Sequence, residues 1–182
     1  MKKVLVTMLI FFTFTIAQAF AYNLRNFTSD AKIMSALQLL EQSGDYDVFA
    51  NLQKNSVKVK FYHLSMNNIY AANAYDEFGR RVILINSMYK DAPVEQIACL
   101  IAHESYHTAR KATLEEETTA TSKEALCWSK LKKAGKIYPQ TKLTKRLDKI
   151  ANLHYASTRD GNDYIEDKIA NSSFYRTQFG LN

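Results

Sequence analysis

Apolar residues recur at helical spacing in the first part of the chain. Ile33 and Met34 are followed by Leu37 and Leu40 at intervals of three or four residues, which predicts a helix with one apolar face. Ser29 or Asp30 can cap the start of this helix, and Gly44 ends it. A shorter helical piece is expected over residues 46–52. The mature chain therefore begins with helices.

The spacing then changes to the alternation that is typical of strands. Apolar and polar residues alternate over 57–62, and residues 69–75 and 81–86 are two further strand candidates. Residues 76–79, Asp-Glu-Phe-Gly, have the composition of a turn, so the second and third strands are expected to form a hairpin. This region predicts a small antiparallel or mixed sheet.

Helical spacing returns after residue 90. Asp91 is expected to cap a helix that carries Pro93 in its first turn, where a missing N–H costs little. Residues 94–102 are apolar around most of the helix circumference, which predicts that this helix is buried and that it runs into His103.

Three more helices are expected in the remainder of the chain. The first begins at Thr113 and ends near Gly135, the second opens at Pro139, and the third covers about 163–175 after a turn at 160–162. The sequence contains no internal repeat and no Pro- or Gly-rich boundary. The predicted fold class is α+β, with a small sheet packed on the helix that runs into His103 and a mostly helical C-terminal part.

The N-terminal segment has the features of a secretory signal peptide. Basic residues at positions 2 and 3 precede an apolar run, Val4 to Ile16, and small residues follow at the two positions that a signal peptidase reads. The run is shorter than the roughly 20 residues that cross a bilayer, so a transmembrane anchor is the weaker alternative. We therefore expect a signal peptide at 1–21, a single domain at 22–182, and an exported protein, periplasmic or secreted, that keeps no membrane span after cleavage.

Charge adds little to this picture. The formal net charge is +6, and removing Lys2 and Lys3 with the signal peptide lowers it to +4. A local run of lysines at 130–136 is interpreted as a solvated helix face, because no aromatic residues are interleaved with it and no nucleic-acid-binding motif accompanies it. Nucleic acid is therefore not expected as a partner.

The strongest chemical signal is the motif His103-Glu104-Ser105-Tyr106-His107. Four residues turn a helix through about 400°, so the two imidazoles point the same way and can hold one zinc ion. Glu104 lies beside the metal, where a carboxylate can act as a general base. The alternative is a chance pair of histidines around a glutamate, but an unpartnered group of this kind is costly to bury on an apolar helix.

A catalytic zinc site needs a third protein ligand, and four glutamates lie close after the motif, at positions 115, 116, 117 and 124. Glu116 fits a capping box with Thr113, and Glu115 is favoured near a helix N-terminus. Glu117 lies on the core-facing side of the expected helix, so it is the preferred third ligand. Glu124 lies at the edge of that face and is the second candidate.

The motif, followed by Glu117-Thr118-Thr119-Ala120 and Trp128, resembles the gluzincin group of zinc metallopeptidases in a minimal, single-domain form. The resemblance covers about 69–128 and implies a zincin-like fold with one Zn²⁺ on His103, His107 and Glu117. It also implies Glu104 as the general base, and a peptide or protein substrate aligned along an edge strand. The residues that match this strand loosely are Ala72, Asn73 and Ala74.

The sequence departs from the gluzincin pattern in two places. Thr121 stands where many members carry an aspartate that orients a zinc-binding histidine. The group also uses a downstream histidine or tyrosine to stabilise the transition state, and His154 and Tyr155 are candidates by position only. His154 fits a solvated helix residue as well. Metzincins are excluded, because Thr113 and Arg110 replace the histidine and the glycine that they require.

Two cysteines, Cys99 and Cys127, lie on the two helices expected to carry the metal ligands. If these helices pack antiparallel with Glu117 facing the motif, their rise per residue brings the two cysteines to about the same level. Either a disulfide or a pair of buried thiols is consistent with this placement, and export would permit the disulfide.

These patterns predict an exported zinc-dependent peptidase. The alternative is a catalytically inactive or latent metallopeptidase-like module that binds peptide and holds a structural zinc. The aromatic residues Phe174, Tyr175 and Phe179 near the C-terminus either cover the cleft, which would make the protein latent, or pack as an ordinary terminal helix.

Overall fold

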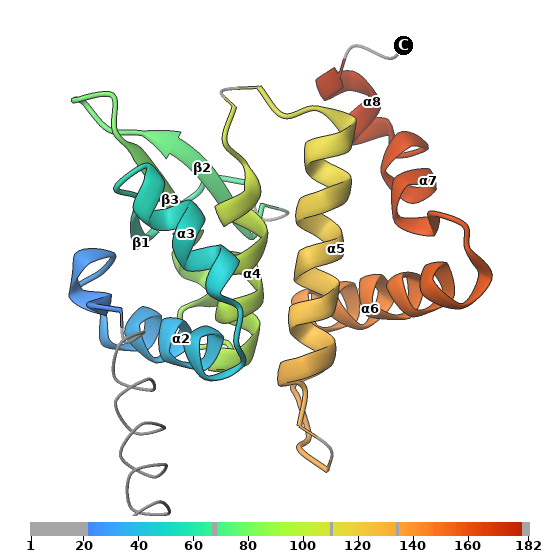
Figure 1. The fold of residues 1–182 in the computed structure, drawn as a ribbon, viewed down its shortest axis with the longest axis horizontal. Helices are drawn as coiled ribbons and strands as arrows, with labels where there is room; N and C mark the ends of the chain where they lie inside the picture. The colour runs from blue at the N-terminus through green and yellow to red at the C-terminus, as the bar shows by residue number, and fades with distance from the viewer. Residues whose placement is uncertain (1–21, 67–68, 110, 134, 180–182) are drawn as a thin grey trace, which may run out of the picture.

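A computed structural model describes residues 22–66, 69–109, 111–133 and 135–179, and the expected signal peptide at 1–21 lies outside them. The chain is α+β, with a small mixed sheet on one side of a mostly helical molecule (Figure 1). In chain order its elements are η1 (Leu24–Asn26), α2 (Ala31–Gln42), α3 (Tyr46–Lys54), β1 (Lys58–Tyr62), β2 (Ala71–Tyr75), β3 (Arg81–Asn86), η2 (Ser87–Tyr89), α4 (Val94–Tyr106), α5 (Leu114–Leu131), α6 (Lys142–Asp160), α7 (Tyr164–Ala170) and α8 (Ser173–Phe179).

The sheet has the strand order β1-β3-β2. β2 and β3 form the expected antiparallel hairpin, with Asn73 opposite Ile83. β1 lies parallel to β3 on the other side, with Val59 opposite Ile83. Central strand β3 is therefore paired on both sides, whereas β2 is an edge strand within the described sheet.

Helix α4 occupies the centre of the molecule. It packs against β2 and β3 on one side, against α2 and α3 on another, and against α5 along its length (Figure 1). Every residue from Glu95 to Ser105 is buried, which confirms the prediction from its apolar circumference. The chain thereby places its motif helix between the sheet and the C-terminal helices.

Several predicted boundaries are wrong. Asp91 does not cap α4, because Pro93 itself is the N-cap residue and the helix begins at Val94. Pro139 does not open α6, which begins at Lys142 after the Thr141 side chain accepts a hydrogen bond from the backbone N–H of Thr144. In each case the helix begins later than a proline or acidic residue alone suggested.

The predicted last helix is also wrong, because it is two helices. The side-chain amide of Asn171 donates to the carbonyl of Asp167 at 2.8 Å, and the Asn171 backbone N–H bonds to the same carbonyl. These bonds satisfy a terminal carbonyl of α7 and end it, since asparagine competes in this way with helix continuation. A separate short helix, α8, follows.

One hydrophobic core joins the sheet, α2 to α7, and Leu24 and Phe27 at and beside η1. Trp128 of α5 is its largest fully buried side chain, and its indole N–H donates to Asp148 of α6 at 2.8 Å. The bond satisfies a buried donor and joins the two helices. Within the described residues, no helix combines the length and the apolar character needed to cross a membrane.

The two cysteines face each other across the contact between α4 and α5. Their Sγ atoms are 3.3 Å apart, and both thiols are buried and free. Burial raises the pKa of the Cys99 thiol well above its usual value. The prediction that Cys99 and Cys127 lie at about the same level of the two helices is therefore confirmed.

We expect protein folded under oxidising conditions to form the Cys99–Cys127 disulfide, because a small movement would bring the sulfurs to the bonding distance of about 2.05 Å. For a loop of this length, with the cysteines 28 residues apart, the bond should stabilise the fold by about 3–4 kcal/mol. Mass spectrometry after alkylation, with and without reductant, measures the thiols. Two free thiols in protein recovered from an oxidising compartment would contradict the prediction, and Cys99→Ser is the control that cannot form the bond.

Candidate metal centre

His103 and His107 lie at the C-terminal end of α4. His103 belongs to the last turn, whereas His107 is the C-cap residue, with an extended backbone conformation (φ −73°, ψ 106°). Their Nε2 atoms are nevertheless only 3.1 Å apart. The two imidazoles therefore point toward one position even though the helix ends between them.

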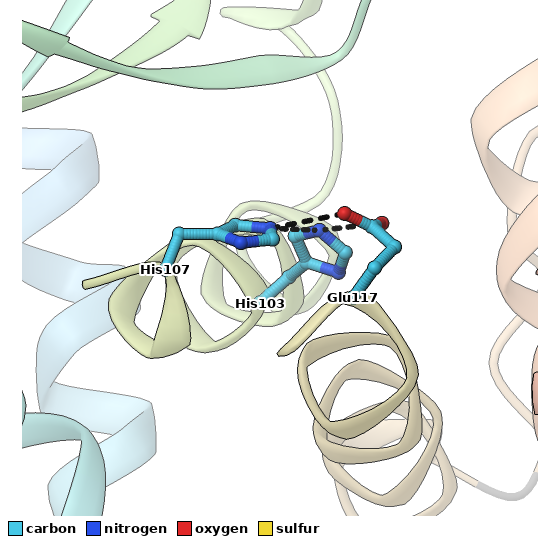
Figure 2. Close-up of side chains that lie close together, drawn as sticks. All are labelled: His103, His107 and Glu117. Carbon is cyan, nitrogen blue, oxygen red and sulfur yellow. Dashed lines mark hydrogen bonds and ion pairs between the residues drawn. The ribbon is translucent and has the colours of Figure 1, made fainter. Parts of the chain in front are cut away.

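Glu117, in the first turn of α5, supplies the third donor group. Its Oε1 lies 3.4 Å from His103 Nε2, and its Oε2 lies 3.3 Å from His107 Nε2 (Figure 2). All three side chains are buried, and one donor atom from each lies within 4.8 Å of the others. The structure thus brings together the three residues predicted as metal ligands, and this group could hold a metal ion.

Each histidine also has a carboxylate on its outer nitrogen. Glu124 Oε2 lies 3.0 Å from His103 Nδ1, and Glu116 Oε2 lies 3.4 Å from His107 Nδ1. Metal-binding histidines commonly have such partners, which hold the ring and select the tautomer that directs Nε2 at the metal. Glu124 therefore lies close enough to His103 to take the role for which Thr121 is unsuited, one helical turn further along α5.

Glu116 does not complete the predicted capping box. Thr113 Oγ1 does accept from the Glu116 N–H at 3.2 Å, but the Glu116 carboxylate accepts from the N–H groups of Thr108, at 2.7 Å, and Ala109. Burial raises the pKa of Glu116, but these backbone hydrogen bonds outweigh it and leave the pKa below its usual value. The side chain instead holds the segment that follows His107.

Glu124 is fully buried and pairs with Arg146 of α6. Arg146 Nη2 lies 2.8 Å from Glu124 Oε2, and Nη1 contacts Oε1. Burial raises the pKa of Glu124, but the charges of Arg146 and His103 lower it to about 2. Glu124 thus lies between His103 and Arg146 and is not part of the converging group of His103, His107 and Glu117.

The electrostatics of the group favour a cation. Burial lowers the pKa of His103, but Glu124, Glu117 and Glu104 together raise it to about 9. The surrounding carboxylates therefore stabilise positive charge at this imidazole, and a metal ion would supply such charge while leaving the ring neutral.

We expect Glu124→Gln to weaken metal binding by about 10- to 100-fold, the usual loss when an outer partner of a ligating histidine is changed. It should also destabilise the fold, because Arg146 keeps its charge and loses its counter-charge. Competition with a chromophoric chelator measures the affinity, and thermal unfolding measures the stability. Glu115→Gln, an exposed change on the same helix, should alter neither, and equal behaviour of the two variants would refute the role of Glu124.

Glu104 is held from the sheet. Asn73 Nδ2 donates to Glu104 Oε2 at 2.6 Å and to the Glu104 carbonyl at 2.8 Å. Arg81 Nε donates to Asn73 Oδ1 at 2.6 Å. Asn73 was expected to contact substrate, but its amide contacts Glu104. The motif gave no indication of Arg81, which binds the Asn73 amide.

A cleft of about 430 Å³ opens beside these groups. Edge strand β2 forms one wall and the C-terminal helix contributes to another. Of the predicted substrate-contact residues, Ala72 and Asn73 line the cleft, whereas Ala74 is not among the lining residues. The wall residues from the C-terminal helix are Phe174, Tyr175 and Gln178.

Tyr175 is a second residue that sequence reasoning did not place at the metal group. Its hydroxyl donates to Glu117 Oε1 at 2.7 Å. Burial and the nearby carboxylate of Glu117 raise the pKa of Tyr175 well above its usual value, so the hydroxyl remains a donor. Phe179, which was expected either to cover the cleft or to pack in an ordinary terminal helix, stacks on Tyr175, with ring centroids 5.7 Å apart. No spacing pattern in the sequence indicated the contact between Tyr175 and Glu117, because it joins positions 58 residues apart.

The structure does not bring His154 or Tyr155 to the metal group. His154 lines a separate hollow with residues of the α6–α7 connection, including Gly161 and Asp163, and Tyr155 is 69% exposed. Both lie on α6, whose side chain in the cleft is Arg146. His154 and Tyr155 were candidates for transition-state stabilisation only by their position along the chain. Neither side chain lines the cleft beside the metal group.

Comparison with known proteins gave no match: no family model, no curated protein and no solved structure is significantly similar to this chain.

Proposed function

We propose that this protein is a zinc-dependent peptidase with a zincin-like fold. One observation carries the proposal: His103, His107 and Glu117 each direct a donor atom at one buried position, with one atom from each within 4.8 Å of the others. With zinc–ligand bonds near 2.05 Å, two ligand atoms of a tetrahedron lie about 3.3 Å apart. The two Nε2 atoms lie 3.1 Å apart, and each lies 3.3 or 3.4 Å from a different oxygen of Glu117.

The donor set supports zinc over calcium and magnesium. Two imidazoles and one carboxylate with an open fourth position are a known catalytic zinc set. Calcium and magnesium prefer oxygen ligands only. The cleft beside the three ligands supplies the space that an open position needs. When bound, zinc would polarise a carbonyl and make water more acidic.

The proposed chemistry of the chain's own residues follows from Glu104. Its carboxylate lines the cleft beside the ligands, where it can take a proton from the attacking water and pass it to the leaving amine. One of its oxygens is held by Asn73. In the described part of the chain the other oxygen accepts no hydrogen bond, which leaves it for the water.

The proposed substrate is a peptide or protein in extended form. β2 has no strand partner on its cleft side in the described sheet, and residues 69–73 line the cleft. An extended peptide can add to such an edge through backbone hydrogen bonds. Because residues 1–21 have the features of a signal peptide, we propose that this activity takes place after export, in the periplasm or outside the cell.

Incubation of the purified protein with denatured casein and with a peptide library tests the proposal. We expect cleavage that stops when a chelator removes the metal and returns when one equivalent of zinc is added back. Cleavage that persists in metal-free protein would refute a zinc-dependent mechanism.

A second candidate is a metallopeptidase-like module that binds peptide without cleaving it, or that is latent. The contact of Tyr175 with Glu117 favours this alternative, because it places a side chain of the same chain beside the metal ligands. Peptide binding without products, in zinc-loaded protein, would favour the module over the enzyme.

A further inference from the structure

Two residues of the β2–β3 hairpin lie on the same side of the sheet and reach the end of α4. Asn73 pairs with Ile83 in the antiparallel register, and Arg81 lies two residues before Ile83 on the same strand. Side chains two apart on a strand share a face. The hairpin therefore presents Asn73 and Arg81 together to the end of the motif helix.

Arg81 binds the C-terminal end of α4 directly. Its Nη2 donates to the carbonyl of Glu104 at 2.8 Å and to the carbonyl of Ser105 at 3.0 Å. These are carbonyls of the last helical turn, at the negative end of the helix, and the Glu104 carbonyl also accepts from the backbone N–H of His107 at 3.3 Å. The side chain is 5% exposed, so its charge is held against the helix by fixed geometry.

Arg81 also decides which way the Asn73 amide faces. An asparagine amide has an acceptor end and a donor end, whereas the arginine side chain offers donors only. Because Arg81 Nε lies 2.6 Å from the amide, the oxygen must face Arg81 and the NH₂ group must face Glu104. The donor is then fixed toward the Glu104 carboxylate.

The result is a chain of contacts from the sheet to the proposed base. Asn73 Nδ2 binds both the backbone carbonyl and the side-chain Oε2 of Glu104. One amide group thereby binds both the carboxylate and the backbone carbonyl of Glu104, which restricts rotation of the Glu104 side chain. Hydrogen bonds to a charged carboxylate are among the stronger ones in proteins.

We propose that Asn73 and Arg81 are positioning residues for Glu104: Arg81 orients the Asn73 amide, and the amide holds the Glu104 carboxylate in the geometry needed for proton transfer. The inference rests on the proposed function. It assigns Asn73 a role different from the substrate contact that the family resemblance implied.

The kinetic test compares Asn73→Ala, Arg81→Lys and the double variant in zinc-loaded protein. Asn73→Ala should lower kcat by about 10- to 100-fold, with KM and zinc content unchanged. Arg81→Lys keeps the charge but loses the planar fork that serves the amide and the carbonyls together, so kcat should fall in the same direction. Because Arg81 acts through Asn73, the double variant should have the kcat of Asn73→Ala alone.

Arg80→Lys is the matched control, because Arg80 is the neighbouring residue, is exposed and pairs with Asp76. It should leave kcat unchanged. A purely structural role predicts something different: the two kcat losses would multiply, and KM or zinc content would change with them. That result, or an unchanged kcat in Asn73→Ala, overturns the inference.

A measurement without turnover separates this inference from the proposed function. In chelator-treated protein, unfolding midpoints of Asn73→Ala, Glu104→Ala and the double variant form a cycle. We expect the double variant to lose less than the sum of the two single losses, because both remove the same hydrogen bond. Additive losses overturn the contact itself. If wild-type protein cleaves nothing while the cycle still shows coupling, the proposed function fails and the contact between Asn73 and Glu104 stands.

Discussion

Glu104→Gln should keep its zinc and lose hydrolysis by about 100- to 10,000-fold, the range that a positioned general base contributes. The amide has the shape of the carboxylate, and its oxygen can still accept the hydrogen bond that Asn73 donates to Glu104. It cannot take a proton from water. The change therefore removes the proposed chemistry while preserving the surrounding geometry.

Parallel measurements of kcat/KM and of zinc content by elemental analysis test this expectation. Glu77→Gln, an exposed change at the turn between β2 and β3, is the control and should match the wild type in both. Full activity in Glu104→Gln would remove this residue as the base. Loss of both zinc and activity would instead assign Glu104 to the metal site.

Substitution of any one of the three ligands should abolish stoichiometric metal binding. His103→Ala, His107→Ala and Glu117→Ala each remove one of three donors, so each should cost more affinity than the roughly 10- to 100-fold expected for an outer partner. Since a ligand bound only by the folded state stabilises it, chelation should lower the unfolding midpoint of the wild type. The stabilisation is about 4 kcal/mol when free zinc is 1,000 times its Kd.

Elemental analysis of protein prepared without chelators, and unfolding with and without chelator, check this prediction. His63→Ala and His154→Ala are controls, because His63 is exposed beyond β1 and His154 lies outside the cleft. Both should retain one equivalent of metal. The chelator should no longer shift the unfolding midpoint of the three ligand variants. Wild-type protein that takes up no metal would end both the metal-site and the peptidase proposals.

Much of the secondary structure could be predicted from local spacing. α2 begins after Asp30, one of the two residues expected to cap it, and the Asp30 carboxylate accepts from the N–H groups of Lys32 and Ile33. The hairpin and the buried character of α4 also follow from residues adjacent in sequence. Helix ends were predicted less well. The side chains of Asn171 and Thr141 form hydrogen bonds at the ends of α7 and α6, and the positions of proline and glycine do not indicate these bonds.

The sequence by itself determined the three candidate ligands. Two histidines one turn apart, and a glutamate on the core-facing side of the next helix, are properties of spacing within single helices. Only the tertiary structure decided the partners of these groups. It placed Glu124 against His103 and Arg146, and Tyr175 against Glu117.

The contact of Asn73 with Glu104 is of the same kind, because it joins residues 31 positions apart. Periodicity reports which side chains share a face of one element, but it carries no information on which face of another element they meet. That depends on how the sheet and α6 pack around α4 and α5. The candidate ligands could therefore be found from the sequence, whereas the residues that contact them required the fold.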